Sequence, residues 1–378
     1  MTTPDATMAD RAERWVSTSE GHSGAGVVLA HADSWGSPGW SATLDRRARE
    51  DGEHDRLAPL ATKASGAGDR VVDEQPDPFR TCFERDRDRI LHANAFRRLA
   101  GKTQVFVFPD DHQRTRLTHA LEVAQIARSV SQAIGLNVAL TEAIAIGHDC
   151  GHGPGGHASE DALTPYLAEG YDHAVWGADV VLVPLNLCSE TLDGVRNHSW
   201  SRPAPATPEG EVVSWADRIA YVCHDFEDAV AAGIVTPDML PPLVADRVGR
   251  DRSRQLGTLV RAMIEATAAT GQIGMVEPVA AALAEFRRFN YDHIYNRPAS
   301  QAQGEAVIAV LRALVEHYAD RPNLLPDAHP TGGLDAGSPD ALRAAVTYVG
   351  GMTDRYACRQ AMALLDWPRE RLPLGIDV

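Results

Sequence analysis

Apolar residues repeated at helical spacing constrain the fold of this chain more than any other feature of its sequence. The clearest repeat runs from Leu117 to Ile134, where one helix face is apolar and Gly135 supplies a natural end. Similar patterns predict further helices at residues 141–148, with Thr141 as the cap, at 158–167 and 213–232, and from 256 onward. A short β-like stretch, Thr103–Phe108, is the exception. We therefore expect an all-α fold with minor β.

The pattern weakens toward the N-terminus. Residues 1–75 are rich in Gly, Ser, Asp and Arg and have no strong helical period, so we interpret them as a partly ordered N-terminal extension. Residues 76–235 contain most of the histidines and are expected to form the catalytic core. Residues 236–378 are expected to form a helical C-terminal region that packs on this core.

The charge balance limits the partners of this chain. With 52 acidic and 36 basic residues the net charge is -16, which disfavours a nucleic-acid coat protein or a binder of anionic membranes. Residues 80–116 nevertheless hold nine Lys or Arg against five acids, so a local basic patch is expected there. Within this patch, the alternating run Arg85–Arg89 is interpreted as a face of ion pairs that is either solvated or part of a subunit interface.

The cysteines and the hydropathy pattern predict a cytoplasmic protein. The five cysteines are scattered and form no CxxC motif, which argues against a disulfide framework and a cysteine zinc site and fits a reducing compartment. The chain has no run of 18 apolar residues and no signal-like apolar segment near residue 1, so a membrane span and a secretory signal are both disfavoured.

The histidines cluster, because nine of the fifteen lie between His92 and His224. Among them is an ordered set with two carboxylates: His119, His148, Asp149 and Asp217. Imidazole and carboxylate ligands without thiolate suit a divalent ion such as Mn, Mg, Co, Fe or Ni. The glycine-rich residues 151–156 cannot continue a helix, so they would leave the open end such an ion needs. A second His-Asp pair at His224 shows that one pair alone is weak support, and a structural histidine is the alternative at each position.

Longer motifs surround these residues in a fixed order: Arg85–Ile90, Phe96–Phe106, Arg114–Val123, His148–His152, Gly156–Glu160, Ala216–Asp225 and Gly350–Ala357. Together they resemble the HD-domain deoxynucleoside triphosphate triphosphohydrolases of the dGTPase type, over about residues 78–365. The chain departs from that family at Gly153 and Gly155, where bulkier residues are usual, and at Ala174. These departures concern the shape of the pocket and the choice of nucleobase more than the metal centre.

The resemblance implies a metal centre and a catalytic pair. His119, His148, Asp149 and Asp217 would bind the divalent ion, and His157 with Glu160 would act in catalysis. Residues three apart on a helix are neighbours, so Glu160 can orient the His157 ring and keep it protonated. The imidazolium would then protonate the departing 5′-oxygen while water attacks the α-phosphorus.

The resemblance also implies a set of substrate-binding residues: Gln104, Arg116, His152, His173, Arg218, Tyr221 and Asp225. The two histidines and Arg218 would contact phosphate, and Gln104, Tyr221 and Asp225 would contact the sugar. Arg114 and Arg116 flank the first metal histidine and could neutralise a triphosphate. The alternative for the two histidines is structural hydrogen bonding. The alternative for the residues after Asp217 is a polar stripe that faces solvent. Arg355 and Tyr356 would close the pocket or a subunit interface.

The expected function is metal-dependent hydrolysis of dGTP or several dNTPs to a deoxynucleoside and inorganic triphosphate. Another HD phosphohydrolase activity, such as a nucleotidase or a cyclic-nucleotide or alarmone hydrolase, stays open, as does a nucleotide-binding regulator with weak catalysis. The resemblance further implies a homo-oligomer, including a hexamer, and an allosteric nucleotide or single-stranded DNA as a further partner. No membrane partner is expected.

Overall fold

The structure, a computed structural model, describes residues 4–19, 21–24, 26–39, 42–326 and 333–375. The chain divides into two compact units, Met1–Leu44 and Asp45–Val378, a division that falls inside the predicted extension. The first unit contains helix α1 (Pro4–Thr18) and two short antiparallel strands, β1 (His22–Gly24) and β2 (Val27–Leu29), with His22 opposite Leu29.

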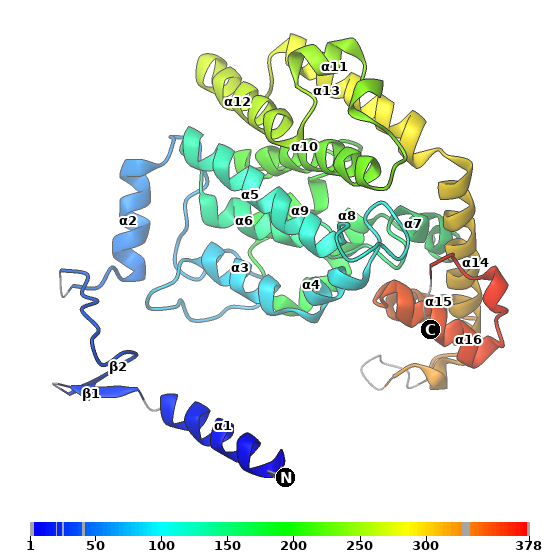
Figure 1. Ribbon diagram of the computed structural model, residues 1–378, viewed down its shortest axis with the longest axis horizontal. Coiled ribbons are helices and arrows are strands. Elements are labelled where there is room, and N and C mark those ends of the chain that lie inside the picture. Colours follow the sequence, from blue (N-terminus) through cyan, green and yellow to red (C-terminus); the bar gives the residue numbers. More distant parts are fainter. Residues whose placement is uncertain (1–3, 20, 25, 40–41, 327–332, 376–378) are drawn as a thin grey trace. The chain divides into compact units, whose positions relative to one another are not determined.

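The second unit is built from helices (Figure 1). Its N-terminal half comprises α2 (Arg46–Arg56), α3 (Cys82–His92), α4 (Asn94–Arg98), η1 (Leu99–Gly101), α5 (Arg116–Ile134), α6 (Val138–Gly147), α7 (His157–Leu163), η2 (Thr164–Tyr166), α8 (His173–Trp176), η3 (Gly177–Val181), η4 (Val183–Leu185) and α9 (Ser189–Asn197). Its C-terminal half comprises α10 (Pro208–Ala231), η5 (Pro237–Met239), α11 (Pro242–Arg247), α12 (Arg252–Thr270), α13 (Glu277–Asn290), η6 (Tyr291–Tyr295), α14 (Pro298–Asp320), η7 (Pro322–Leu324), α15 (Pro339–Gly350), α16 (Asp354–Leu365) and η8 (Arg369–Arg371).

The predicted all-α class with minor β is confirmed, but the β-like stretch is not a strand. Residues 103–108 form irregular bends, with a single antiparallel bridge between Thr103 and Thr115. Phe108 has a φ of 54°, which ends any extended run. The β-branched and aromatic pattern of this segment therefore reflects partial burial against the core and not pairing with another strand.

Helix boundaries follow local capping chemistry. The predicted helix at 117–134 is confirmed as α5, which ends at Gly135 in the left-handed conformation. The prediction that Thr141 caps the next helix is wrong. Asn137 caps α6, because its side chain accepts from the Leu140 backbone N–H, and Thr141 is buried one turn later.

Helix α2 was not predicted, because it has almost no apolar residues. Its residues are nearly all charged, so the sequence has no apolar periodicity that would predict a helix there. The helix is held instead by polar contacts: Asp45 caps its N-terminus, Arg46 pairs with Glu50, and Arg49 pairs with Glu84 of α3. These contacts attach part of the predicted extension to the second unit.

Two apolar clusters build the second unit. The larger one gathers buried residues of α3, α5, α6, α10, α12 and α13, including Ile126, Ile144 and Ile219. The smaller one gathers residues of α7, α14, α15 and α16, including Leu163, Leu314 and Val346. Figure 1 shows α14, α15 and α16 beside α7 at one end of this unit. All five cysteines are buried without a disulfide, and none of the described helices is both long and apolar enough to cross a bilayer.

Glu209, at the start of α10, anchors an irregular segment near residue 62 to the core. Its side chain is fully buried and accepts hydrogen bonds from the Thr62 backbone N–H (3.1 Å), the Thr62 hydroxyl (2.7 Å) and the Asn137 backbone N–H (2.9 Å). Asn137 in turn donates to Glu53 of α2 at 3.2 Å. These polar contacts fix the position of the segment that precedes the histidine-rich core.

Replacing Glu209 by Ala should destabilise the protein by about 3 kcal/mol, because the substitution leaves one buried and two half-buried donors without their acceptor. Glu211→Ala, a half-buried position on the same helix, is the matched control and should cost less than about 0.5 kcal/mol. Urea unfolding followed by circular dichroism measures both values. Equal effects of the two substitutions would contradict this role of Glu209.

Candidate active site

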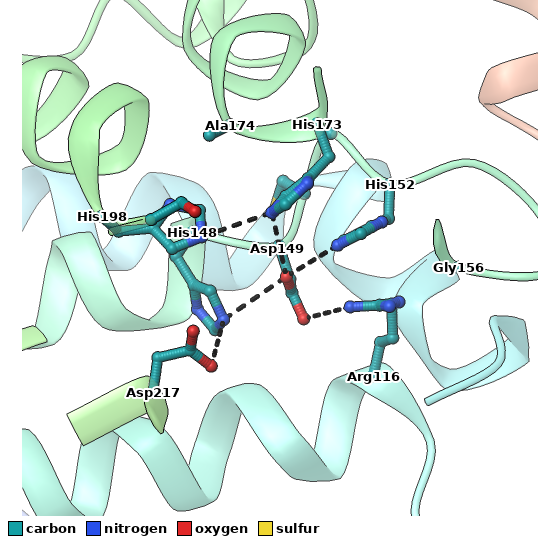
Figure 2. Close-up of polar contacts among 12 residues, drawn as sticks. Arg116, His148, Asp149, His152, Gly156, His173, Ala174, His198 and Asp217 are labelled. Atoms are coloured by element: carbon teal, nitrogen blue, oxygen red, sulfur yellow. Dashed lines mark hydrogen bonds and ion pairs between the residues drawn. The ribbon is translucent and has the colours of Figure 1, made fainter. Parts of the chain in front are cut away.

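The four predicted metal ligands come together in the structure. His119 lies on α5, Asp217 lies on α10, and the pair His148–Asp149 follows directly after α6. The Nε2 atom of His119 is 3.0 Å from Asp217 Oδ1, and that of His148 is 3.7 Å from the same oxygen. Asp149 Oδ1 lies 3.4 Å from His148 Nε2. Figure 2 shows His148, Asp149 and Asp217 facing one another.

The ring of His148 shows that this cluster fits a divalent cation. Its Nδ1 atom donates to the Ala145 carbonyl at 2.6 Å, which leaves Nε2 as the ring atom that could bind a metal ion. Nε2 is buried, has no hydrogen-bond partner, and faces two carboxylates. A ring nitrogen and two carboxylates that converge in this way are a ligand set that suits a divalent cation. A histidine that binds a metal through one ring nitrogen and a carbonyl through the other is the usual arrangement of such ligands.

Asp149 is the most enclosed anion of the site. Its side chain is only 4% exposed, and Arg116 Nη1 donates to its Oδ2 atom at 2.7 Å. The ring of His152 lies 3.2 Å from its other oxygen. Burial alone would raise the pKa of Asp149, but Arg116 and the neighbouring histidines hold it well below its usual range. Asp149 is therefore an anion at neutral pH, as a metal ligand must be.

The loop after Asp149 lets α8 approach the cluster closely. A Cβ atom at Gly151 would lie 2.0 Å from the His173 carbonyl oxygen and 2.4 Å from the Gly177 nitrogen, so only glycine fits there. This contact brings His173 to within 3.9 Å of Asp149, measured from its Nε2 atom to Oδ1. The glycine-rich stretch thus positions a histidine as well as ending a helix.

Glu160 contacts a different histidine from the one predicted. Its Oε1 atom accepts from His173 Nδ1 at 2.5 Å and from the His173 backbone N–H at 3.0 Å. His157 is the first residue of α7, and its ring lies against His152, with centroids 5.0 Å apart. Burial lowers the pKa of His173, but Glu160 outweighs this effect and raises it overall. The orienting carboxylate expected for His157 therefore belongs to His173.

His157 lines the pocket without such a partner. Its side chain is accessible to solvent within the pocket but is densely surrounded by protein atoms. Desolvation, reinforced by the positive charge of Arg116, lowers the pKa of His157 to about 4. The ring is thus neutral at neutral pH in this arrangement, which differs from the imidazolium expected from the sequence.

His198 belongs to the same cluster, although the sequence did not single it out. It follows α9, its Nδ1 atom contacts the Val195 carbonyl at 2.8 Å, and its Nε2 atom lies 3.3 Å from His173 Nε2. Figure 2 shows His198 beside His148 and His173. Among the described residues, ligand atoms of His148, Asp149 and His198 also lie within 4.8 Å of one another. A histidine followed by serine carries no motif that would have revealed this role.

The predicted substrate-binding residues surround one cavity of about 420 Å³. The following predicted residues line it: Gln104, Arg116, His152, His157, His173, Arg218, Tyr221 and Asp225, together with the metal-type residues His119, Asp149 and Asp217. His148 and Glu160 do not line the cavity but contact residues that do. Buried polar atoms of Gln104, Arg218 and Asp225 have no hydrogen-bond partner in the described chain.

Four further residues of the cavity were not predicted. Tyr295 donates to Asp225 Oδ2 at 2.5 Å, and burial raises the pKa of Asp225 to about 7. Arg287 Nε donates to the Tyr221 hydroxyl at 2.6 Å, and its guanidinium lies over Tyr291. Trp200 supports Arg218, whose Cζ atom lies 3.4 Å from the ring centroid. Two tyrosines four residues apart, at 291 and 295, were the only local signal.

Arg114 does not line the cavity. Its guanidinium pairs with Glu122 (2.8 Å), Glu227 (2.7 Å) and Asp228 (2.5 Å), so its charge is already neutralised. The ion pairs expected for the run Arg85–Arg89 are present: Arg85 and Arg89 pair with Glu74, and Arg87 pairs with Glu142. Arg355 lies over the Phe108 ring, and the Tyr356 hydroxyl contacts that of Tyr348.

Comparison with known proteins matches this site to a family. Residues 116–222 match the HD domain, and residues 273–363 match the phosphohydrolase-associated domain. A deoxyguanosinetriphosphate triphosphohydrolase-like protein of Caldanaerobacter subterraneus is 38% identical over 319 residues, which cover 82% of this chain and 93% of that protein. Proteins with the same name in Clostridium tetani (36%, covering 82% and 93%) and Clostridium perfringens (38%, covering 76% and 87%) are similar.

The helical fold and the histidine–aspartate cluster therefore define an HD-domain phosphohydrolase, a hydrolase with a site that could hold a divalent metal. Within that class, the chain belongs to the family of deoxyguanosinetriphosphate triphosphohydrolase-like proteins.

Replacing His148 by Ala should weaken Mn²⁺ binding by more than about tenfold, because it removes the nitrogen that faces both carboxylates. The protein is stripped with chelator, and binding is measured by isothermal titration calorimetry and by elemental analysis after dialysis. His92→Ala, an exposed position on α3, is the control and should bind like the wild type. Undiminished binding by the His148 variant would place the ion elsewhere.

The contacts of Arg114 predict how stability depends on pH. Burial alone would raise the pKa of Glu122, but His224 and Arg114 lower it from 4.5 to about 2. Glu122 thus contributes stability that is present above pH 4.5 and lost as the pH falls toward 2. The urea midpoint of an Arg114→Met variant should therefore fall less steeply between pH 5 and pH 3 than that of the wild type. Arg128→Met, at an exposed ion pair, should keep the wild-type slope, and parallel curves for Arg114→Met would refute the assignment.

Proposed function

We propose that this protein hydrolyses deoxynucleoside triphosphates, dGTP or several dNTPs, to a deoxynucleoside and inorganic triphosphate. The observation that carries the proposal is the pair Glu160–His173, whose histidine lines the same cavity as three of the predicted metal ligands and three arginines. The family to which the chain belongs supports it, since its named members are deoxyguanosinetriphosphate triphosphohydrolase-like proteins.

In this proposal His119, His148, Asp149 and Asp217 hold the divalent ion. Mn, Mg, Co, Fe and Ni all accept imidazole and carboxylate ligands, and the donor set does not choose between them. An ion bound there supplies neutralisation of charge on the phosphoryl group. Arg116 keeps Asp149 ionised and oriented toward that position.

Three arginines bind the triphosphate. Arg116, Arg218 and Arg287 line the cavity, and Arg218 and Arg287 are held by aromatic rings rather than by carboxylates. The charges of Arg218 and Arg287 are therefore available to phosphate oxygens, for which guanidinium groups are well suited. His152 and His157 lie beside the same part of the cavity and would donate further hydrogen bonds to phosphate.

His173 rather than His157 is proposed as the proton donor. Glu160 accepts from its Nδ1 atom and so fixes the ring and stabilises its charged form. As water attacks the α-phosphorus, His173 Nε2 gives a proton to the 5′-oxygen, and the bond between phosphorus and that oxygen breaks. The oxygen atom of the water ends in the triphosphate, and the sugar leaves with its hydroxyl restored.

The sugar would lie against the wall formed by α10 and η6. Tyr221 and Asp225 are one turn apart on α10, and Tyr295 of η6 contacts Asp225. In the proposal, Asp225 accepts from the 3′-hydroxyl while the tyrosine rings leave little room for a 2′-hydroxyl. Gln104, which lines the cavity, would complete the contacts to the sugar. A homo-oligomer and an allosteric nucleotide or single-stranded DNA partner stay predictions.

Identifying the reaction products tests the proposed activity. Purified protein with Mn²⁺ or Mg²⁺ and each dNTP should yield the deoxynucleoside and triphosphate on ion-exchange chromatography. In ¹⁸O-labelled water the label should appear in the triphosphate. A monophosphate with pyrophosphate would point to another HD phosphohydrolase activity, and tight binding without turnover would point to a nucleotide-binding regulator.

The role of the pair is tested by substitution. His173→Ala and Glu160→Gln should each lower kcat by about 100-fold or more, because both remove the oriented proton donor. His157→Ala should mainly raise KM, since this residue is assigned to phosphate binding. Asp161→Asn, an exposed neighbour of Glu160, is the control and should keep wild-type rates. A larger loss of kcat for His157→Ala than for His173→Ala would reverse the assignment.

A further inference from the structure

Two sequence strings that lie far apart meet beside the site through Asp354 and Thr103, and neither of these two residues has a role in the chemistry described so far. Asp354 belongs to the string Gly350–Ala357, and Thr103 belongs to the string Phe96–Phe106, 251 residues away. Asp354 Oδ2 accepts from the Thr103 backbone N–H at 2.8 Å and from the Thr103 hydroxyl at 2.6 Å. Its other oxygen accepts from the backbone N–H of Gly155 at 2.8 Å.

Lys102 makes a second connection between the same segments. Its side chain is buried, and its ammonium group donates to the Gly350 carbonyl at 3.0 Å and to the His152 carbonyl. The loop of residues 151–156, here called the histidine loop, is therefore held at two points. Lys102 holds its second residue, and Asp354 holds its fifth.

The carboxylate of Asp354 is not needed by its own helix. Thr353 caps α16, because its hydroxyl accepts from the Tyr356 backbone N–H. Asp354 is only 6% exposed, and a buried carboxylate is costly unless it is fully hydrogen-bonded. All of its hydrogen bonds in the described chain go to Thr103 and Gly155, so its placement serves the contact between the C-terminal region and the histidine loop.

The segments that Asp354 and Lys102 hold include residues that line the cavity. Thr103, Gln104, His152 and Gly155 all line it. Gly155 has a φ of +75°, and a Cβ atom there would lie 2.4 Å from Val307 of α14, so the loop has little freedom on that side. A displacement of catalytic groups by about 1 Å can lower a rate by about 100-fold.

We propose that Asp354 and Lys102 are positioning residues that fix the histidine loop and the segment after Lys102 for hydrolysis of the nucleotide. They touch no reacting atom and act through His152 and Gln104. The C-terminal helices thereby complete the catalytic site and do not merely cover the core. This inference rests on the proposed function.

The first test uses steady-state kinetics of the full chain on dGTP with Mn²⁺. Asp354→Asn replaces one accepting oxygen by a donor and should lower kcat/KM by about 30-fold or more, mainly by raising KM, because the displaced His152 and Gln104 are assigned to binding phosphate and sugar. Thr103→Val should lower kcat/KM less, and Thr103→Ser, which keeps the hydroxyl, should retain most of the activity that the valine variant loses. Asp340→Asn, an exposed aspartate in the first turn of α15, is the matched control.

A double-mutant cycle with His152→Ala separates positioning from general destabilisation. If Asp354 acts through the histidine loop, Asp354→Asn should cost much less in the His152→Ala background than in the wild type. Additive effects on kcat/KM would overturn the proposal. The number of nucleotide-binding sites per chain, measured by equilibrium dialysis at saturating nucleotide, should stay that of the wild type, because loss of sites in proportion to activity would indicate unfolding instead.

Hydrogen exchange followed by mass spectrometry tests the inference independently of activity. In the Asp354→Asn variant, exchange should rise in peptides that cover residues 150–157 and 103–108 and should stay at the wild-type level in α14 and α15. An equal rise throughout the C-terminal helices, or none in the histidine loop, would overturn the positioning role. A wild-type protein that turns over no dNTP would refute the proposed function, whereas the exchange pattern would still decide whether Asp354 fixes the loop.

Discussion

The site depends on one buried carboxylate, Asp149. A buried anion is stable only when cations and hydrogen-bond donors surround it, and here they come from several elements. Arg116 comes from α5, His148 from the end of α6 and His152 from the glycine-rich loop. Because each partner lies on a different element, Asp149 stays ionised in its buried position only when those elements are packed together.

The predicted metal cluster could be recognised in the sequence because each of its parts lies in a motif that resembles a known family, although His119 and Asp217 are 98 residues apart. His119 lies in the most periodic helix of the chain, and His148 and Asp149 are adjacent and followed by glycines. The partner of Glu160 could not be predicted in the same way. Spacing along a helix favours His157, but that residue is the first of α7 and its ring turns toward His152. Glu160 is then free to meet His173, whose position depends on how the loop at Gly151 packs against α8.

The residues that the sequence did not reveal come mostly from outside the predicted core. Arg287 and Tyr295, from α13 and η6, form one wall of the cavity, and Asp354 holds the loop beneath it. Composition and periodicity place a boundary near residue 235, because they report on local structure alone. The residues that line a cavity come from segments that are far apart in the sequence. No local sequence pattern therefore identifies them as neighbours. Helix α2 escaped prediction for a related reason, since ion pairs and buried polar contacts hold it in place of an apolar stripe.

The distribution of charge explains how an acidic chain can select an anionic ligand. Most arginines in the basic stretch of residues 80–116 are neutralised by carboxylates, as Arg85 is by Glu74 and Arg114 is by three acids. In the described chain, no carboxylate lies within ion-pair distance of Arg218 or Arg287, and both are held by aromatic side chains. Arg218 and Arg287 thus present positive charge in the cavity that no ion pair neutralises, and partial burial strengthens its effect. An anion with several charges gains most from such a field.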